Sequence, residues 1–91
     1  MTEKFWQNRT VTELRDLVRR LRKRAIFHKH VHPYNRRVGK QQLIKMLSTK
    51  FHVRRMHNYP GRFVIRSRMV DFGFVYVHGR YFLDGSLQEE L

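Results

Sequence analysis

Residues 62–77 read RFVIRSRMVDFGFVYV, and this stretch decides the class of fold that the chain can adopt. β-Branched and aromatic side chains dominate it, and such side chains fit the pleated surface of a sheet. We expect one strand over residues 62–69 and a second over residues 70–77. The second half of the chain is therefore expected to build a sheet.

Turn signals bound this stretch on both sides. Before it, residues 57–61 have the Asn, Pro and Gly content of a turn, and residues 52–55 are expected to form a short strand. After it, residues 78–80 turn the chain, and residues 81–83 return as a last strand. Because short turns join antiparallel neighbours, the sheet is expected to be mainly antiparallel.

The first half of the chain carries two amphipathic helical patterns. Thr10, with Glu13 three residues later, is a capping box, in which a hydroxyl and a carboxylate satisfy free amides at a helix start. We expect a helix over about residues 11–24, with an apolar stripe formed by Leu14, Leu17, Val18 and Leu21. A second helix is expected within residues 38–51, with an apolar side formed by Leu43, Ile44, Leu47 and Phe51.

A further strand is expected between these helices, over residues 25–32, because Pro33 cannot donate to a strand ladder. The element order predicts an α+β fold: a small single domain with a helix packed on a mainly antiparallel sheet. Its core runs strand-helix-strand-strand, and an extra N-terminal helix precedes it. Within residues 1–91 we distinguish a helical segment at about 11–24, an α+β core at about 25–84 and a short acidic tail at 85–91.

The charge of the chain points to a polyanionic partner. Its 91 residues include 20 Lys and Arg against 7 Asp and Glu, a formal net charge of +13. Such a charge repels itself, and binding to phosphates relieves the repulsion and releases condensed counterions. No apolar run approaches the roughly 20 residues of a membrane span, and residues 1–8 contain no secretory signal core, so no membrane partner is expected.

Arginines and lysines fall in separate clusters along the chain. The guanidinium group matches phosphate geometry with two hydrogen bonds, which makes these clusters the expected nucleic-acid contacts. Aromatic residues between Phe63 and Phe82 lie among them, and we expect most of these rings to fill the core. The candidate contact residues are Arg22, Lys23, Arg24, Lys29, His30, His32, Arg36, Arg37, Lys40, Arg54, Arg55, Arg62, Arg66 and Arg68.

Three histidines alternate with other residues at positions 28, 30 and 32, so one face of an extended strand could carry all three. Three imidazoles can bind zinc. The chain has no cysteine, however, no carboxylate lies nearby, and Arg24 and Lys29 would repel a cation. We therefore expect hydrogen bonds from these histidines to phosphate or ribose, and no metal.

Signals for catalysis are poor. The serines lack the context of a nucleophile elbow, no Walker-type phosphate loop is present, and the carboxylates form no close pair in sequence. We expect a protein that is not an enzyme, with no cofactor and no small-molecule substrate. Two alternatives stay open: a DNA-binding regulatory module with residues 11–24 as its recognition helix, and a small metal-dependent nuclease that uses the three histidines.

Two segments suggest a family. One runs from His32-Pro33 through Val38, Lys40, Leu43 and Leu47 to Phe51, and the other reads FGFVY at residues 72–76 with Tyr81 five residues later. Together with Lys4-Phe5 and Asn8-Arg9, they resemble the twenty-four-e family of small-subunit ribosomal proteins of archaea and eukaryotes. The family's glycine-rich stretch between its last strands is replaced by residues 65–69, and its long basic C-terminal tail is absent. The chain therefore resembles a shortened member.

This resemblance implies a structural constituent of the small ribosomal subunit that binds and positions ribosomal RNA through phosphate contacts. It implies that His32, Pro33 and Lys40 lie at the RNA-facing end of the domain. Neighbouring ribosomal proteins would be further partners, in a cytoplasmic ribosome or an organellar one. Residues 40–53 are also similar to the large-subunit twenty-three family, which is the rival interpretation. In either case we expect RNA to be recognised mostly by its shape, because side chains do not reach into the deep A-form major groove.

Overall fold

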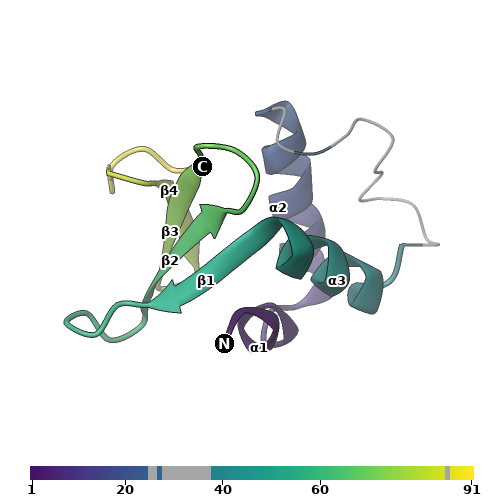
Figure 1. Ribbon diagram of the computed structural model, residues 1–91, viewed down its shortest axis with the longest axis horizontal. Helices are drawn as coiled ribbons and strands as arrows, with labels where there is room; N and C mark the ends of the chain where they lie inside the picture. Colours follow the sequence, from purple (N-terminus) through teal and green to yellow (C-terminus); the bar gives the residue numbers. More distant parts are fainter. Residues whose placement is uncertain (25–26, 28–37, 86) are drawn as a thin grey trace.

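The α+β fold predicted from the sequence is confirmed. The computed structural model describes residues 1–24, 27, 38–85 and 87–91. In this part of the chain the helices are α1 (Thr2–Gln7), α2 (Val11–Lys23) and α3 (Lys40–Lys50). The strands are β1 (Phe51–Arg55), β2 (Arg62–Ser67), β3 (Gly73–Val77) and β4 (Arg80–Leu83). The helices gather on one side of the sheet, and both termini lie at the surface (Figure 1).

The sheet is an antiparallel meander in the order β1-β2-β3-β4. Its register places Val53 opposite Ile65, and Ile65 opposite Phe74. Because side chains alternate across a strand, these three point to the same face, and all three are buried. That face meets the helices and forms the core with them.

Helix α2 forms as its sequence predicts. The Glu13 backbone N–H donates to the Thr10 hydroxyl at 3.1 Å, and the Glu13 carboxylate accepts from the Thr10 backbone N–H at 3.4 Å, which completes the capping box. The apolar stripe is buried throughout: Leu14, Leu17, Val18 and Leu21.

Helix α3 also forms, but it ends one residue before the predicted boundary. Leu43, Ile44 and Leu47 are buried as expected. The prediction that Phe51 belongs to the helical stripe is wrong, because its backbone is extended and it is the first residue of β1. Helix and strand therefore join without a loop. Phe51 still reaches the core, since the inner face of β1 continues the buried side of α3.

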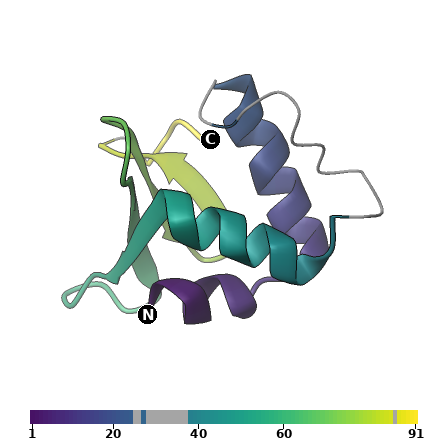
Figure 2. The same cartoon turned by 45° about the vertical axis from the view of Figure 1, so that its right-hand side comes forward.

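Helix α1 was missed by the sequence analysis. It has only six residues and no side-chain cap, so its local signal is weak. Tertiary contacts hold it instead: Phe5 and Trp6 are buried, and the Val53 backbone N–H donates to the Thr2 hydroxyl at 3.0 Å. Figure 2 shows α1 running beside α3, and α1 also contacts β1.

Strands β2 and β3 are shorter than predicted, whereas β1 and β4 are each one residue longer. Strand β2 ends at Ser67, whose hydroxyl accepts hydrogen bonds from the backbone N–H groups of Met69 and Val70 and so turns the chain out of the sheet. Strand β3 begins only at Gly73. Arg80 belongs to β4 and not to the preceding turn, because His78 and Gly79, both with positive φ, suffice to reverse the chain. The predicted strand at 25–32 lies outside the described residues except for Phe27, which is buried.

The C-terminal residues run along the free edge of β4. The Leu83 N–H donates to the Glu89 carbonyl at 3.1 Å, and the Leu91 N–H donates to the Tyr81 carbonyl at 2.8 Å. Arg20 of α2 donates to the Leu91 carbonyl at 3.0 Å. Within the described residues, no helix is long and apolar enough to cross a membrane.

The capping box predicts a measurable contribution to stability. Thr10→Ala removes both side-chain bonds of Thr10 and should lower the free energy of unfolding by about 1 kcal/mol. Urea denaturation followed by circular dichroism measures the change. Thr12→Ala, two residues further along the same helix and exposed, is the matched control and should cost nothing. Equal losses in both variants would show that the cap does not matter.

Tyr81 predicts a pH dependence of stability. Burial raises the pKa of its hydroxyl well above the usual value of about 10, and that hydroxyl has no hydrogen-bond partner among the described residues. Above about pH 10 the unfolded chain loses this proton while the folded chain keeps it, so stability falls as pH rises.

Tyr81→Phe removes both the unpaired hydroxyl and its ionisation. At neutral pH the free energy of unfolding should be unchanged or higher by up to about 1 kcal/mol. Above about pH 10 the variant should lose less stability than the parent chain. Urea denaturation at the two pH values measures both effects, and identical losses in the two proteins would contradict the prediction.

Candidate nucleic-acid interface

The second face of the sheet points away from all described helices (Figures 1 and 2). We call it the open face. The register defines its members, because they alternate with the core residues on each strand. They are His52 and Arg54 on β1, Arg62, Val64 and Arg66 on β2, Gly73, Val75 and Val77 on β3, and Arg80 and Phe82 on β4.

An apolar band crosses the middle of the open face. Val64 pairs with Val75, and Val75 pairs with Phe82, so the three lie side by side on neighbouring strands. Val75 is buried although it does not belong to the helix-facing core. The aliphatic parts of neighbouring long side chains can cover such a band while their charged ends stay in water. The face therefore combines an apolar centre with a cationic margin.

One arginine of this margin is neutralised. Arg66 forms an ion pair with Asp84, which follows β4 on the far side of β3. To reach it, the Arg66 side chain crosses β3 at Gly73: a Cβ atom on Gly73 would lie 2.7 Å from Arg66 Cδ and from Nη1. Glycine at this position therefore gives Arg66 its path across the sheet.

The other arginines of the margin have no such partner. Arg54 and Arg80 form no ion pair with any carboxylate in the described part of the chain, and both are exposed. Arg62 places its guanidinium 4.5 Å from the centre of the Tyr59 ring, a cation–π contact that leaves its charge uncompensated. These three cations lie on β1, β2 and β4, and are thus distributed across the whole width of the sheet.

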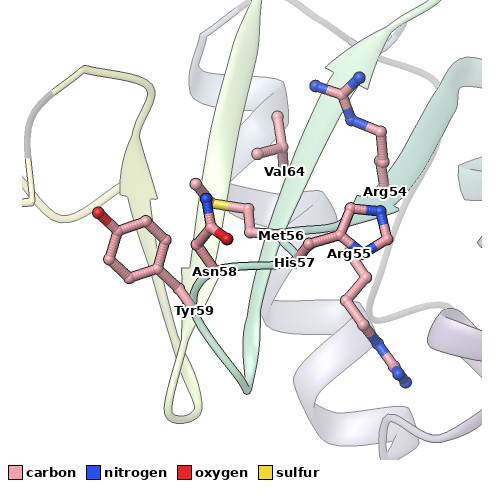
Figure 3. Close-up of a pocket in the computed structure, with 7 residues that line it drawn as sticks. All are labelled: Arg54, Arg55, Met56, His57, Asn58, Tyr59 and Val64. Carbon is pink, nitrogen blue, oxygen red and sulfur yellow. The ribbon is translucent and has the colours of Figure 1, made fainter.

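A hollow of about 290 Å³ opens where β1 ends and β2 begins. Seven residues line it: Arg54, Arg55, Met56, His57, Asn58, Tyr59 and Val64 (Figure 3). The Met56 N–H donates to the Arg62 carbonyl, and the Arg62 N–H donates to the Tyr59 carbonyl, which ties down both ends of the β1–β2 loop. Gly61, with a φ of 79°, lets the loop close.

The structure brings together three of the predicted contact residues on the open face: Arg54, Arg62 and Arg66. Arg55 is not among them. It follows Arg54 in sequence but points to the other side of the sheet, where its guanidinium lies 5.9 Å from the centre of the Phe63 ring. Adjacent basic residues on a strand therefore contribute to different surfaces.

The remaining predicted contacts lie elsewhere or outside the described residues. Arg68 lies in the β2–β3 connection, and Lys40 begins α3. Arg22, Lys23 and Arg24 are at the C-terminal end of α2. The predictions for Lys29, His30, His32, Arg36 and Arg37 fall outside the described residues.

Sequence reasoning missed His52, Tyr59, Arg80 and Phe82. His52 and Arg54 do alternate with the buried Phe51 and Val53, which is a signal that could have been found. Arg80 was assigned to a turn, so its side of the sheet could not be inferred. Most of the other aromatic rings are in the core, as expected: Phe74 and Tyr81 are buried, and Phe63, Phe72 and Tyr76 pack against the core cluster.

Residues 1–24, 27, 38–85 and 87–91 contain no group of three His, Cys, Asp or Glu side chains placed to hold a metal ion. The histidines at 28, 30 and 32 lie outside these ranges. Comparison with family models, with curated proteins and with solved structures finds no match of any kind. The resemblance to a ribosomal family therefore stays a prediction.

The Arg66–Asp84 ion pair predicts that the Asp84 carboxylate keeps Arg66 from binding phosphate. Asp84→Asn should free Arg66 and steepen the dependence of polyanion affinity on salt by about one released ion. Fluorescence anisotropy with a labelled RNA hairpin at several salt concentrations measures the slope. Asp71→Asn is the matched control, because it also raises the net charge by one but has no ion pair with Arg66. Equal slopes in the two variants would contradict a specific role for Asp84.

Proposed function

We propose that this chain is a structural RNA-binding protein and that its partner is ribosomal RNA, in the small ribosomal subunit. One observation carries the proposal: the open face presents Arg54, Arg62 and Arg80, which form no ion pair with a carboxylate of the described residues, on a sheet whose other face packs against the helices. The role would be architectural. The fold holds the arginines at fixed positions, and phosphates of the RNA bind to them.

The geometry favours an extended polyanion over a single small anion. Neighbouring strands lie about 4.8 Å apart, so cations on β1, β2 and β4 span roughly 14 Å. One phosphate group cannot reach across that distance, whereas a nucleic-acid backbone carries charges at regular intervals along its length. Arginine suits the task because it donates two parallel hydrogen bonds to phosphate and keeps its charge at any physiological pH.

A second basic region supports a bridging role. Lys23 and Arg24 are exposed at the end of α2, on the helix side of the sheet. A protein with cations on two different sides can hold two RNA segments in a fixed relation. The likeness of residues 32–51 and 72–81 to the twenty-four-e family is the reason for naming ribosomal RNA of the small subunit.

Sedimentation of a native lysate on a sucrose gradient tests the proposal. The chain should travel with the small subunit and stay there in moderate salt. Travel with the large subunit would favour the rival twenty-three family. Absence from every ribosomal fraction would refute the ribosomal role, and preferential binding to duplex DNA in that case would favour the regulatory module.

The open face itself predicts a loss of affinity. Arg54→Gln combined with Arg80→Gln should weaken binding to a ribosomal RNA fragment by at least about tenfold in moderate salt. The logarithmic salt slope should fall by roughly 1.5, because two phosphate contacts are lost. Filter binding or anisotropy measures both quantities.

The matched control removes the same charge from the helix side. Lys4→Gln combined with Lys45→Gln changes two exposed lysines on α1 and α3. This variant should retain most of the affinity. If both double variants lose affinity equally, only net charge matters and the open face is not the interface.

A further inference from the structure

The hollow at the β1–β2 end of the open face differs from the rest of that face. Val64 and Met56 give it apolar walls, and the Tyr59 ring and the Asn58 side chain stand beside them (Figure 3). Arg54 borders it on the open face, whereas the Arg55 side chain extends to the other side of β1. Phosphate contacts alone need no apolar recess. The apolar walls of the hollow therefore suit another part of a nucleotide, the base.

We propose that this hollow receives one unpaired base of the RNA. The inference rests on the proposed function and names the feature of RNA that this part of the interface recognises. Its volume of about 290 Å³ lies just below the roughly 300–1,000 Å³ typical of small-molecule sites. A single flat ring system suits a recess of this size, whereas a paired helix is too large to enter it.

Tyr59 supplies the stacking surface. Its side chain is 50% exposed and lines the hollow together with Val64. The guanidinium of Arg62 lies 4.5 Å from the ring centre and restricts the ring's orientation. A ring that is already held loses little freedom when a base stacks on it, and stacking on aromatic side chains is how single-stranded RNA is commonly bound.

Asn58 and Arg54 supply the polar contacts. The amide of Asn58 carries both donors and an acceptor, so it can hydrogen-bond the edge of a base. Arg54 borders the hollow on the open face, where its guanidinium can bind a phosphate next to the inserted nucleotide. The Arg55 side chain points to the other side of the sheet and takes no part in this contact.

This geometry selects an unpaired base and not a duplex. In a duplex each base has its flat faces covered by neighbours and its pairing edge occupied. A bulged or looped nucleotide offers both. The sequence led us to expect recognition mostly by RNA shape, and the hollow adds recognition of a single base at this end of the sheet.

The test uses two RNA hairpins that differ by one base. Both contain a single bulged nucleotide, which is 2-aminopurine in one hairpin and an abasic residue in the other, so their phosphate counts are equal. The full chain should bind the hairpin with the base about tenfold more tightly, within the range that one stacked base provides. The fluorescence of 2-aminopurine should fall on binding, because the base stacks.

Variants of Tyr59 locate the effect. Tyr59→Ala should bind the two hairpins equally, whereas Tyr59→Phe, which keeps the ring, should retain the preference. Tyr59 is half exposed in a loop, so both variants should keep the fold, and circular dichroism checks this. A preference that survives Tyr59→Ala would overturn the assignment of the base to this hollow.

The outcomes separate this inference from the proposed function. If the full chain binds both hairpins tightly and equally, the base site is wrong while the RNA-binding proposal stands. If it binds neither hairpin even in low salt, the proposed function fails, and the base site fails with it.

Discussion

The structure depends on one constraint: the helices cover a single face of a four-stranded sheet. An antiparallel sheet tolerates water on one side, provided that the other side is buried. Here Trp6, Leu17 and Leu47 meet Phe51 and Phe74 in one continuous core. None of the described helices packs on the second face, so the apolar surface of these helices serves one core only. Exposed arginines lie on the open face, which no described helix covers.

Core and interface are coupled through the strand register. Val53, Ile65 and Phe74 face inward because they lie in one register row, and Arg54 and Arg62 face outward for the same reason. A slip of one residue would move cations into the core and apolar side chains into water, which no set of local contacts could offset. The buried residues fix the strand register, and the register fixes the positions of the arginines on the open face.

The sequence allowed the helices to be predicted better than the interface. The capping box and the apolar stripe of α2 are local patterns, and both are present in the structure. Helix α1 has no comparable local pattern, since the burial of Phe5 and Trp6 against distant residues is what holds it. Arg54 and Arg55 looked like one basic cluster, because a sequence shows neighbours and not faces. Their positions on the predicted strand separate them, because adjacent residues of a strand point to opposite faces.

The charge of the open face also explains how it can stay uncovered. An exposed sheet face with an apolar band invites association with a second copy, and unpaired strand edges invite strand addition. The edge of β4 is occupied by the chain's own C-terminal residues, and the Val53 N–H on β1 is bonded to Thr2. Two open faces brought together would set Arg54, Arg62 and Arg80 against their own copies, and like charges in close contact are strongly unfavourable. The same cations that would attract RNA therefore disfavour self-association through this face, so its apolar band can remain available for a partner of opposite charge.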